Sequence, residues 1–171
     1  AFAGNSELGL PRLTGTILIF DRETGMLKSM MDGGLITNMR TGAAGAVGCK
    51  YLARPESEDL LLVGTGTQGP GLLDAAVRVM KQLRRIWVVN PHSPHKAAPF
   101  CETVRALVPE GVELLPTDDL EGAVRRADVI LTATPSRAAL IRDEWVKPGT
   151  HLSCIGSDME GKQELEETLL S

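Results

Sequence analysis

Residues 60–69 read LLLVGTGTQG, and this stretch decides the fold. Residues 60–63 form a short apolar run, which is typical of a strand buried on both faces of a parallel sheet. The next six residues fit the pattern G-x-G-x-x-G, and Pro70 suits the first turn of a helix. Apolar residues then recur at helical spacing from Leu73 to Leu83. A buried strand, a glycine-rich turn and a helix in this order predict a βαβ unit.

The same alternation continues toward the end of the sequence. Short apolar runs predict strands at residues 86–89, 112–115, 129–131 and 151–155. Helical spacing predicts helices at 96–107 and after a capping pair formed by Asp118 and Glu121, and a last short helix at 161–170. The predicted fold class is therefore α/β, with a Rossmann-type doubly wound parallel sheet over about residues 59–156.

The beginning of the chain follows a different pattern. Residues 13–20 and 26–31 predict the two strands of a hairpin, and Thr37 is predicted to cap a helix over 38–53. Within that helix, residues 41–48 read TGAAGAVG. Glycine costs a helix interior about 1 kcal/mol relative to alanine, so a compensating close contact is expected. Tight packing against other helices and contact with a ligand are both open explanations.

These patterns predict two parts of the chain. Residues 1–54 would belong to a second domain or an interface, and residues 55–160 would form a dinucleotide-binding Rossmann domain.

Composition narrows the function classes. The sequence has 18 Lys and Arg against 22 Asp and Glu, which leaves no basic surface for nucleic acid or an anionic membrane. No apolar run approaches the roughly 18 residues of a spanning helix, and no signal peptide is visible. Cys49, Cys101 and Cys154 are widely spaced, which indicates reduced thiols and a cytoplasmic protein. His92 and His95 have no third candidate ligand, so no metal site is predicted.

The glycine-rich turn predicts a site for a pyrophosphate. The first glycine would permit the tight turn, the second would let the backbone approach the ligand, and the third would let helix and strand pack closely. Free N–H groups and the helix dipole would hold the negative charge. The candidate cofactor-binding residues are Gly64, Thr65, Gly66, Thr67, Gln68 and Gly69. A purely structural glycine turn is the alternative.

The end of the following strand normally selects the cofactor. An acidic side chain about 20 residues after the loop would hold the ribose 2′-hydroxyl of NAD. This sequence has Asn90 there, followed by His92, His95 and Lys96. A basic pocket without a carboxylate suits a 2′-phosphate, so NADP is predicted and NAD is the alternative. Asn90 and His92 are cofactor-binding candidates, although the histidines of a solvated loop could equally bind nothing.

Five stretches carry a family resemblance. They are GTILIFDRETG, MMDGGLITNMRTGAAGAVGCKYLAR, LLLVGTGTQG, ADVILTATPS and VKPGTHLSCIGSDMEGKQEL, in this order. Together they resemble the ornithine cyclodeaminase/mu-crystallin family over essentially the whole chain. The resemblance implies a Rossmann domain joined to a split domain that forms a homodimer. It makes residues 1–54 part of this substrate or dimerisation domain and residues 161–171 a segment that returns toward it. It also implies NAD(P)-dependent hydride transfer at the carbon that bears an amino or imino nitrogen.

The resemblance also implies roles for individual residues. Arg40 would bind the substrate carboxylate close to the nicotinamide, because a guanidinium fork matches a carboxylate. Arg40 and Thr41 would also contact the cofactor. Residues at strand ends that would flank the cofactor are Thr132, Ala133, Thr134 and Ile155.

Asp158 is the candidate catalytic residue. By resemblance it would serve as acid or base toward the substrate nitrogen, and a helix N-cap is the alternative. Lys162 matches the family motif, and an ion pair with Glu160 or Glu164 is its simplest role.

Three functions are compatible with the resemblance. The leading one is an NAD(P)-dependent reductase of a small imino acid, of the ketimine or pyrroline-2-carboxylate type, or oxidation of the matching amino acid. An ornithine or lysine cyclodeaminase that recycles bound NAD is the rival, and a non-enzymatic, mu-crystallin-like binding protein is a third. The family's catalytic lysine would precede or fall at AFAGN, and closing segments would follow residue 171. We therefore expect a longer parent chain.

Overall fold

The computed structural model describes residues 3–11 and 14–170. The chain divides into two compact units, Ala1–Arg40 and Thr41–Ser171. A short 3-10 helix, Ala3–Ser6, lies in the first unit. In the described part of the chain, no helix is both long and apolar enough to cross a membrane.

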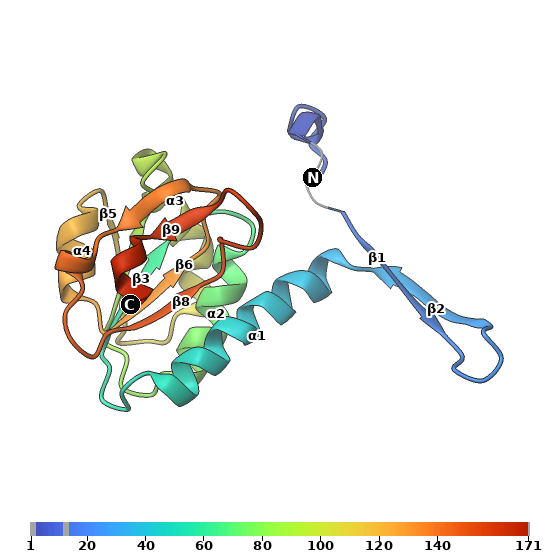
Figure 1. Ribbon diagram of the computed structural model, residues 1–171, viewed down its shortest axis with the longest axis horizontal. Coiled ribbons are helices and arrows are strands. Elements are labelled where there is room, and N and C mark those ends of the chain that lie inside the picture. Colours follow the sequence, from blue (N-terminus) through green and yellow to red (C-terminus); the bar gives the residue numbers. More distant parts are fainter. Residues whose placement is uncertain (1–2, 12–13, 171) are drawn as a thin grey trace. The chain divides into compact units, whose positions relative to one another are not determined.

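The first unit is built on an antiparallel hairpin of β1 (Thr16–Phe20) and β2 (Leu27–Asp32) (Figure 1). Asp21 closes its turn, because its carboxylate accepts hydrogen bonds from two turn amides and pairs with Lys28 at 2.6 Å. The predicted hairpin is confirmed from Thr16 onward, and Leu13 lies outside the described residues.

Helix α1 (Gly34–Leu52) begins earlier than the sequence predicts. Thr37 lies inside its first turn, where its amide donates to the carbonyl of Gly33, so its predicted role as cap is wrong. The first amide of the helix is bound instead by Asp32, whose Oδ1 accepts a hydrogen bond from the Gly34 amide at 2.9 Å.

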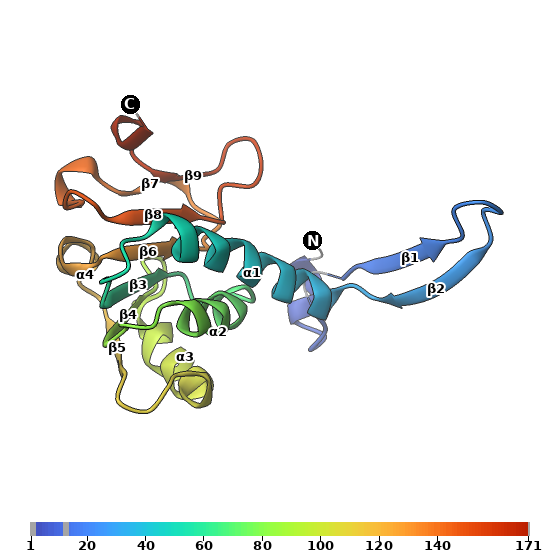
Figure 2. The ribbon, with the colours of Figure 1, turned by 90° about the horizontal axis from the view of Figure 1, so that it is seen from below.

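Five parallel strands form the sheet of the second unit in the order β5-β4-β3-β6-β8 (Figure 2). The strands are β3 (Asp59–Val63), β4 (Arg85–Val89), β5 (Glu113–Thr117), β6 (Val129–Thr132) and β8 (His151–Cys154). Every residue of the central strand β3 is buried, as its apolar run predicts. The predicted Rossmann-type parallel sheet is confirmed.

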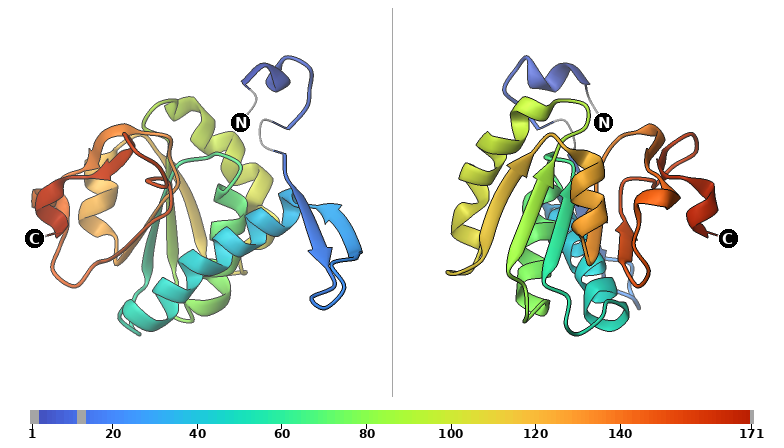
Figure 3. Two further views of the ribbon diagram at one scale, coloured as in Figure 1. Left: turned by 45° about the vertical axis from the view of Figure 1, so that its right-hand side comes forward. Right: turned by 90° about the vertical axis from the view of Figure 1, so that its left-hand side faces the viewer.

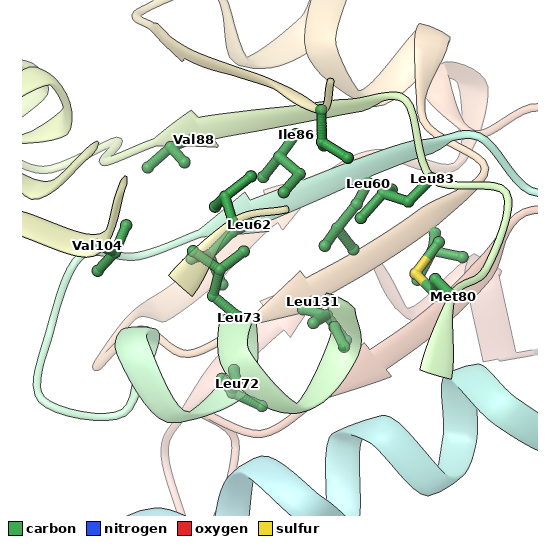
Figure 4. Packing of buried hydrophobic residues seen from close by; sticks show 14 of the residues in the cluster. Leu60, Leu62, Leu72, Leu73, Met80, Leu83, Ile86, Val88, Val104 and Leu131 are labelled. Atoms are coloured by element: carbon green, nitrogen blue, oxygen red, sulfur yellow. The ribbon is translucent and has the colours of Figure 1, made fainter. Parts of the chain in front are cut away.

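Helices cover both faces of this sheet (Figure 3). Successive side chains of a strand point to opposite faces. Leu60 and Leu62 therefore pack on the side of α2 (Gly69–Val79) and α3 (Ala97–Val104), where Leu72 and Leu73 of α2 meet them (Figure 4). Leu61 and Val63 face the opposite layer, which contains α4 (Leu120–Arg126).

The helix boundaries differ in detail from the predicted ones. Pro70 does occupy the first turn of α2. Helix α3 is shorter than predicted, because 3-10 turns at Pro94–Lys96 and Arg105–Leu107 flank it. The cap of α4 is Asp119 and not Asp118, since Asp119 Oδ1 accepts a hydrogen bond from the Gly122 amide at 2.8 Å.

The predicted helix at 161–170 is wrong. Strand β9 (Gln163–Leu165) lies there and pairs in parallel with β7 (Arg137–Ile141), and a 3-10 turn, Glu167–Leu170, follows. Another 3-10 turn, Asp143–Trp145, follows β7. A three-residue strand is too short to show any periodicity, so its pairing depends on a partner that is distant in sequence.

Three glycines of α1, which all belong to the second unit, pack closely against other residues of that unit. A Cβ on Gly42 would overlap the carbonyl of Gly71, in the first turn of α2. On Gly45 it would lie 2.7 Å from Leu72 Cδ2, and on Gly48 it would lie 2.9 Å from His151 Nε2. Of the two explanations left open for these glycines, tight packing against another helix is confirmed at Gly42 and Gly45, which meet α2, whereas Gly48 meets strand β8.

Candidate functional site

The glycine-rich turn lies between the end of β3 and the start of α2, at the carboxyl edge of the sheet. Gly64 has a φ of 109°, a conformation that L side chains rarely adopt, and a Cβ there would lie 2.6 Å from the Ala133 carbonyl oxygen. A Cβ on Gly69 would lie 2.9 Å from the Phe100 ring. Gly66 instead faces open space, with no atom within 4 Å of its Cβ position. Two glycines therefore serve packing, and Gly66 leaves the backbone accessible.

This turn offers unpaired polar groups. The backbone amides of Gly66, Thr67 and Gln68 have no hydrogen-bond acceptor among the described residues. The buried Oε1 of Gln68 also lacks a partner there. The N-terminus of α2 adds the positive end of a helix dipole. Open backbone and free donors at a helix start fit a dinucleotide pyrophosphate.

Asn90 lies at the end of β4, next to the glycine-rich turn. Its Nδ2 donates to Thr65 Oγ1 at 2.7 Å, and its Oδ1 accepts from the amides of His92 and Ser93 at 3.2 and 2.9 Å. Through these bonds the Asn90 side chain fixes the loop after β4 next to the glycine-rich turn. They connect two of the predicted cofactor-binding segments.

A cavity of about 430 Å³ opens beside this loop. Its lining includes Thr65 together with His95 and Lys96 from the 3-10 turn before α3. His92, the predicted candidate, is exposed and does not line this cavity. Lys96 therefore brings a positive charge to the cavity that Thr65 of the turn lines.

The ends of β6 and β8 meet at one buried carboxylate. Glu164, on β9, is 1% exposed and accepts hydrogen bonds from Thr132, Thr134 and the Gly156 amide. Thr132, Ala133, Thr134 and Ile155 therefore lie together, since the Ile155 amide also donates to the Thr132 carbonyl at 2.8 Å. Glu164 has no predicted site role, and only the stretch GKQEL marks it in the sequence.

Cys154, at the end of β8, lies beside this carboxylate. Burial raises the pKa of its thiol, and the charge of Glu164 adds to that shift. Cys154, Arg137 and Lys162 line a cavity of about 480 Å³ next to β9.

Asp158 lies in the exposed turn between β8 and β9. Its Oδ1 accepts a hydrogen bond from Lys162 Nζ at 2.6 Å, and this bond is the main reason that its pKa is lowered. The expected pairing of Lys162 with Glu160 or Glu164 is therefore wrong. The N-cap alternative for Asp158 also fails, because a strand and not a helix follows. An ionised carboxylate held by a cation can accept a proton.

The two remaining candidates lie on α1. Arg40 is exposed and belongs to the first unit, whereas Thr41 is half-buried and belongs to the second. Thr41 precedes Gly42, which contacts α2 at Gly71, so Thr41 lies close to the start of α2. The described residues contain no group of three His, Cys, Asp or Glu side chains suited to a metal ion.

A parallel sheet of this order, with a glycine-rich turn after its central strand, defines a Rossmann-type α/β domain. The chain belongs to the ornithine cyclodeaminase/mu-crystallin family, whose family model matches residues 1–171.

Individual relatives agree with this assignment. The chain is 33% identical to the Delta(1)-pyrroline-2-carboxylate reductase of Paracoccus denitrificans, over 99% of this chain and 52% of the relative. It resembles a solved archaeal alanine dehydrogenase dimer with bound NAD, with a TM-score of 0.88 and 35% identity over 98% of this chain and 50% of the other. A lysine cyclodeaminase structure, described with recognition of L-lysine, L-ornithine and L-2,4-diaminobutyric acid, gives a TM-score of 0.85 and 36% identity over 98% and 48%. The chain thus spans about half the length of these relatives.

Proposed function

We propose that the protein containing this chain is an NAD(P)-dependent oxidoreductase that reduces a small imino acid, of the ketimine or pyrroline-2-carboxylate class, or oxidises the matching amino acid. The observation that carries the proposal is the glycine-rich turn, which is open at Gly66 and has unpaired amides at the start of α2. The similarity to a pyrroline-2-carboxylate reductase supports the choice of substrate class.

The chain's own residues would divide the work as follows. Arg40 would bind the substrate carboxylate through its guanidinium fork. Asp158, kept ionised by Lys162, would accept a proton from the substrate nitrogen during oxidation and return one during reduction. Thr41, the turn 64–69 and the strand ends at 132–134 and 155 would hold the dinucleotide, which supplies or accepts the hydride when bound.

We infer that NADP is preferred over NAD. No carboxylate stands at the end of β4, where one would hold the ribose 2′-hydroxyl of NAD. Asn90 is already engaged with Thr65, His92 and Ser93, and Lys96 lines the neighbouring cavity. A cation there suits a 2′-phosphate.

We also propose a homodimeric, cytoplasmic protein. The dimeric alanine dehydrogenase supports the assembly, and the three free cysteines support a reducing compartment. In this proposal residues 1–54 contribute to substrate binding or dimerisation, residues 55–160 bind the dinucleotide, and residues 161–171 lead back toward the first domain.

A substrate panel tests the activity. The full-length protein is mixed with cyclic and acyclic imino acids and either NADPH or NADH, and loss of the reduced nicotinamide absorbance is followed. Steady oxidation with a cyclic imino acid is expected. No turnover with any imino or amino acid would contradict the proposal.

A cyclodeaminase is the second candidate, because the lysine cyclodeaminase is 36% identical to this chain. Release of ammonia from lysine or ornithine without net change in the cofactor would establish it in place of the reductase.

A further inference from the structure

Glu164 is a buried carboxylate without a role in the proposed chemistry. Its Oε1 accepts hydrogen bonds from the amide and the hydroxyl of Thr134, both at 2.7 Å. Its Oε2 accepts from Thr132 Oγ1 at 2.7 Å and from the Gly156 amide at 2.9 Å. A carboxylate offers about four lone-pair sites, so these four donors fill them.

The donors come from a functionally significant edge of the sheet. Thr132 ends β6, and Gly156 follows shortly after the end of β8, so Glu164 bridges two adjacent strands where ligands of doubly wound sheets bind. A Cβ on Gly156 would overlap both Glu164 and the Thr134 carbonyl. The backbone after both strands is therefore held closely around this carboxylate.

The glycine-rich turn rests on the same backbone. Gly64 lies so close to the Ala133 carbonyl that a Cβ would come within 2.6 Å of it. Ala133 stands between the two threonines that Glu164 holds. A shift of residues 132–134 would therefore be transmitted directly to the first residue of the turn.

We propose that Glu164 is a positioning residue for the dinucleotide: it fixes the ends of β6 and β8 and, through Ala133, the glycine-rich turn. This inference rests on the proposed function, because it presumes that a dinucleotide binds at this edge. Glu164 itself acts through the backbone it holds and needs no contact with the ligand.

Asp128 provides a matched control at the opposite edge of the sheet. It directly precedes β6, and its carboxylate accepts from the amides of Glu58 and Asp59 and pairs with Arg54 and Lys147. It thus joins chain segments as Glu164 does, but at the amino ends of the strands. A role limited to stability predicts that Asp128→Asn and Glu164→Gln behave alike.

The test titrates full-length wild type, Glu164→Gln and Asp128→Asn with NADPH and with NADH, read by nicotinamide fluorescence, alongside thermal unfolding. In Glu164→Gln an NH2 group would replace one carboxylate oxygen. That NH2 group would face protein groups that also donate hydrogen bonds, and these would lose their acceptor. We expect Glu164→Gln to raise the cofactor Kd about tenfold, the scale of one unsatisfied buried group. Asp128→Asn should lower the unfolding midpoint and leave Kd within about twofold of wild type.

A milder variant keeps the test informative if Glu164→Gln does not fold. Glu164→Asp keeps the charge and shortens the side chain by one methylene, so that the carboxylate no longer reaches all four donors, and we expect about a threefold increase in Kd. Wild-type affinity in the folded Glu164 variants, or an equal loss in Asp128→Asn, would overturn the positioning role. If wild type binds neither cofactor, the proposed function falls as well.

Discussion

Asp158 and Lys162 form an ion pair that should govern the response of the reaction to pH. The hydrogen bond from Lys162 lowers the pKa of Asp158 below its usual 3.8, so the carboxylate stays ionised at lower pH than a free one. Lys162→Met would remove this effect, and the pKa of Asp158 would rise. Because a base must be unprotonated to act, the acidic limb of kcat/KM against pH should move to higher pH.

Asp158→Asn is the companion variant for this profile. It should lower kcat by about a hundredfold or more, the usual contribution of a positioned acid or base. An acidic limb that stays in place in Lys162→Met would contradict the assignment, as would full activity in Asp158→Asn.

Lys96 should decide between the two cofactors. Lys96→Met would remove the cation that lines the cavity beside Thr65, and a charged hydrogen bond is worth roughly 1.5–3 kcal/mol. The KM for NADPH should therefore rise by about tenfold or more, while the KM for NADH stays unchanged. Steady-state kinetics with both cofactors measures the two KM values. Lys81→Met is the control, because Lys81 does not line the cavity beside Thr65. An equal change for both cofactors would rule out a 2′-phosphate contact.

The sequence predicts the structural environment of some residues and not of others. The turn 64–69 follows from local spacing, because its strand and helix are adjacent in the chain. Glu164 does not, because a carboxylate between Gln163 and Leu165 resembles an ordinary surface charge. Its burial arises from donors at residues 132, 134 and 156, which only the fold brings to it.

Among the secondary-structure elements, α1 and the glycine-rich turn use glycine for different purposes. Gly42→Ala would push a methyl group into the Gly71 carbonyl, a backbone atom that cannot move aside. We expect the free energy of unfolding to fall by about 1–3 kcal/mol, the usual cost of overpacking. Thermal or denaturant unfolding measures this loss.

Gly66→Ala is the matched substitution, because its methyl group would enter open space. The free energy of unfolding should stay at the wild-type value, whereas the Kd for NADPH should rise about tenfold through lost backbone approach to the pyrophosphate. Unchanged NADPH binding in Gly66→Ala would count against a pyrophosphate site, and unchanged stability in Gly42→Ala against the packing of α1.

Strands of the central sheet are predictable, and the small β7–β9 pair is not. Residues 60–63 and 129–131 are uninterrupted apolar runs because both faces of their strands are covered. In β7 only Ile141 is buried, and β9 has three residues. Neither strand carries enough buried side chains to produce a pattern, so their pairing is a tertiary effect.

For the molecule as a whole, we predict that exposed apolar residues of the β1–β2 hairpin form the dimer interface. Phe20 is 54% exposed and Met30 is 70% exposed, and an isolated two-stranded hairpin is only marginally stable in water. Phe20→Asp with Met30→Asp should convert the full-length protein from dimer to monomer in light scattering. Leu8→Asp, at another exposed apolar residue of the same unit, is the control and should remain dimeric. A dimer that survives the double substitution would place the interface elsewhere.

The contact between Gly48 of α1 and His151 of β8 also bears on how the chain folds during synthesis. Ribosomes add about 5–20 residues per second, so α1 emerges several seconds before β8 does. During that interval Gly42 and Gly45 can already pack against α2, but Gly48 does not yet have His151 of β8 as a neighbour. We therefore expect the face of α1 around Gly48 to stay uncovered until β8 has been synthesised. A ribosome stalled before residue 151 would expose that face to chaperones and proteases.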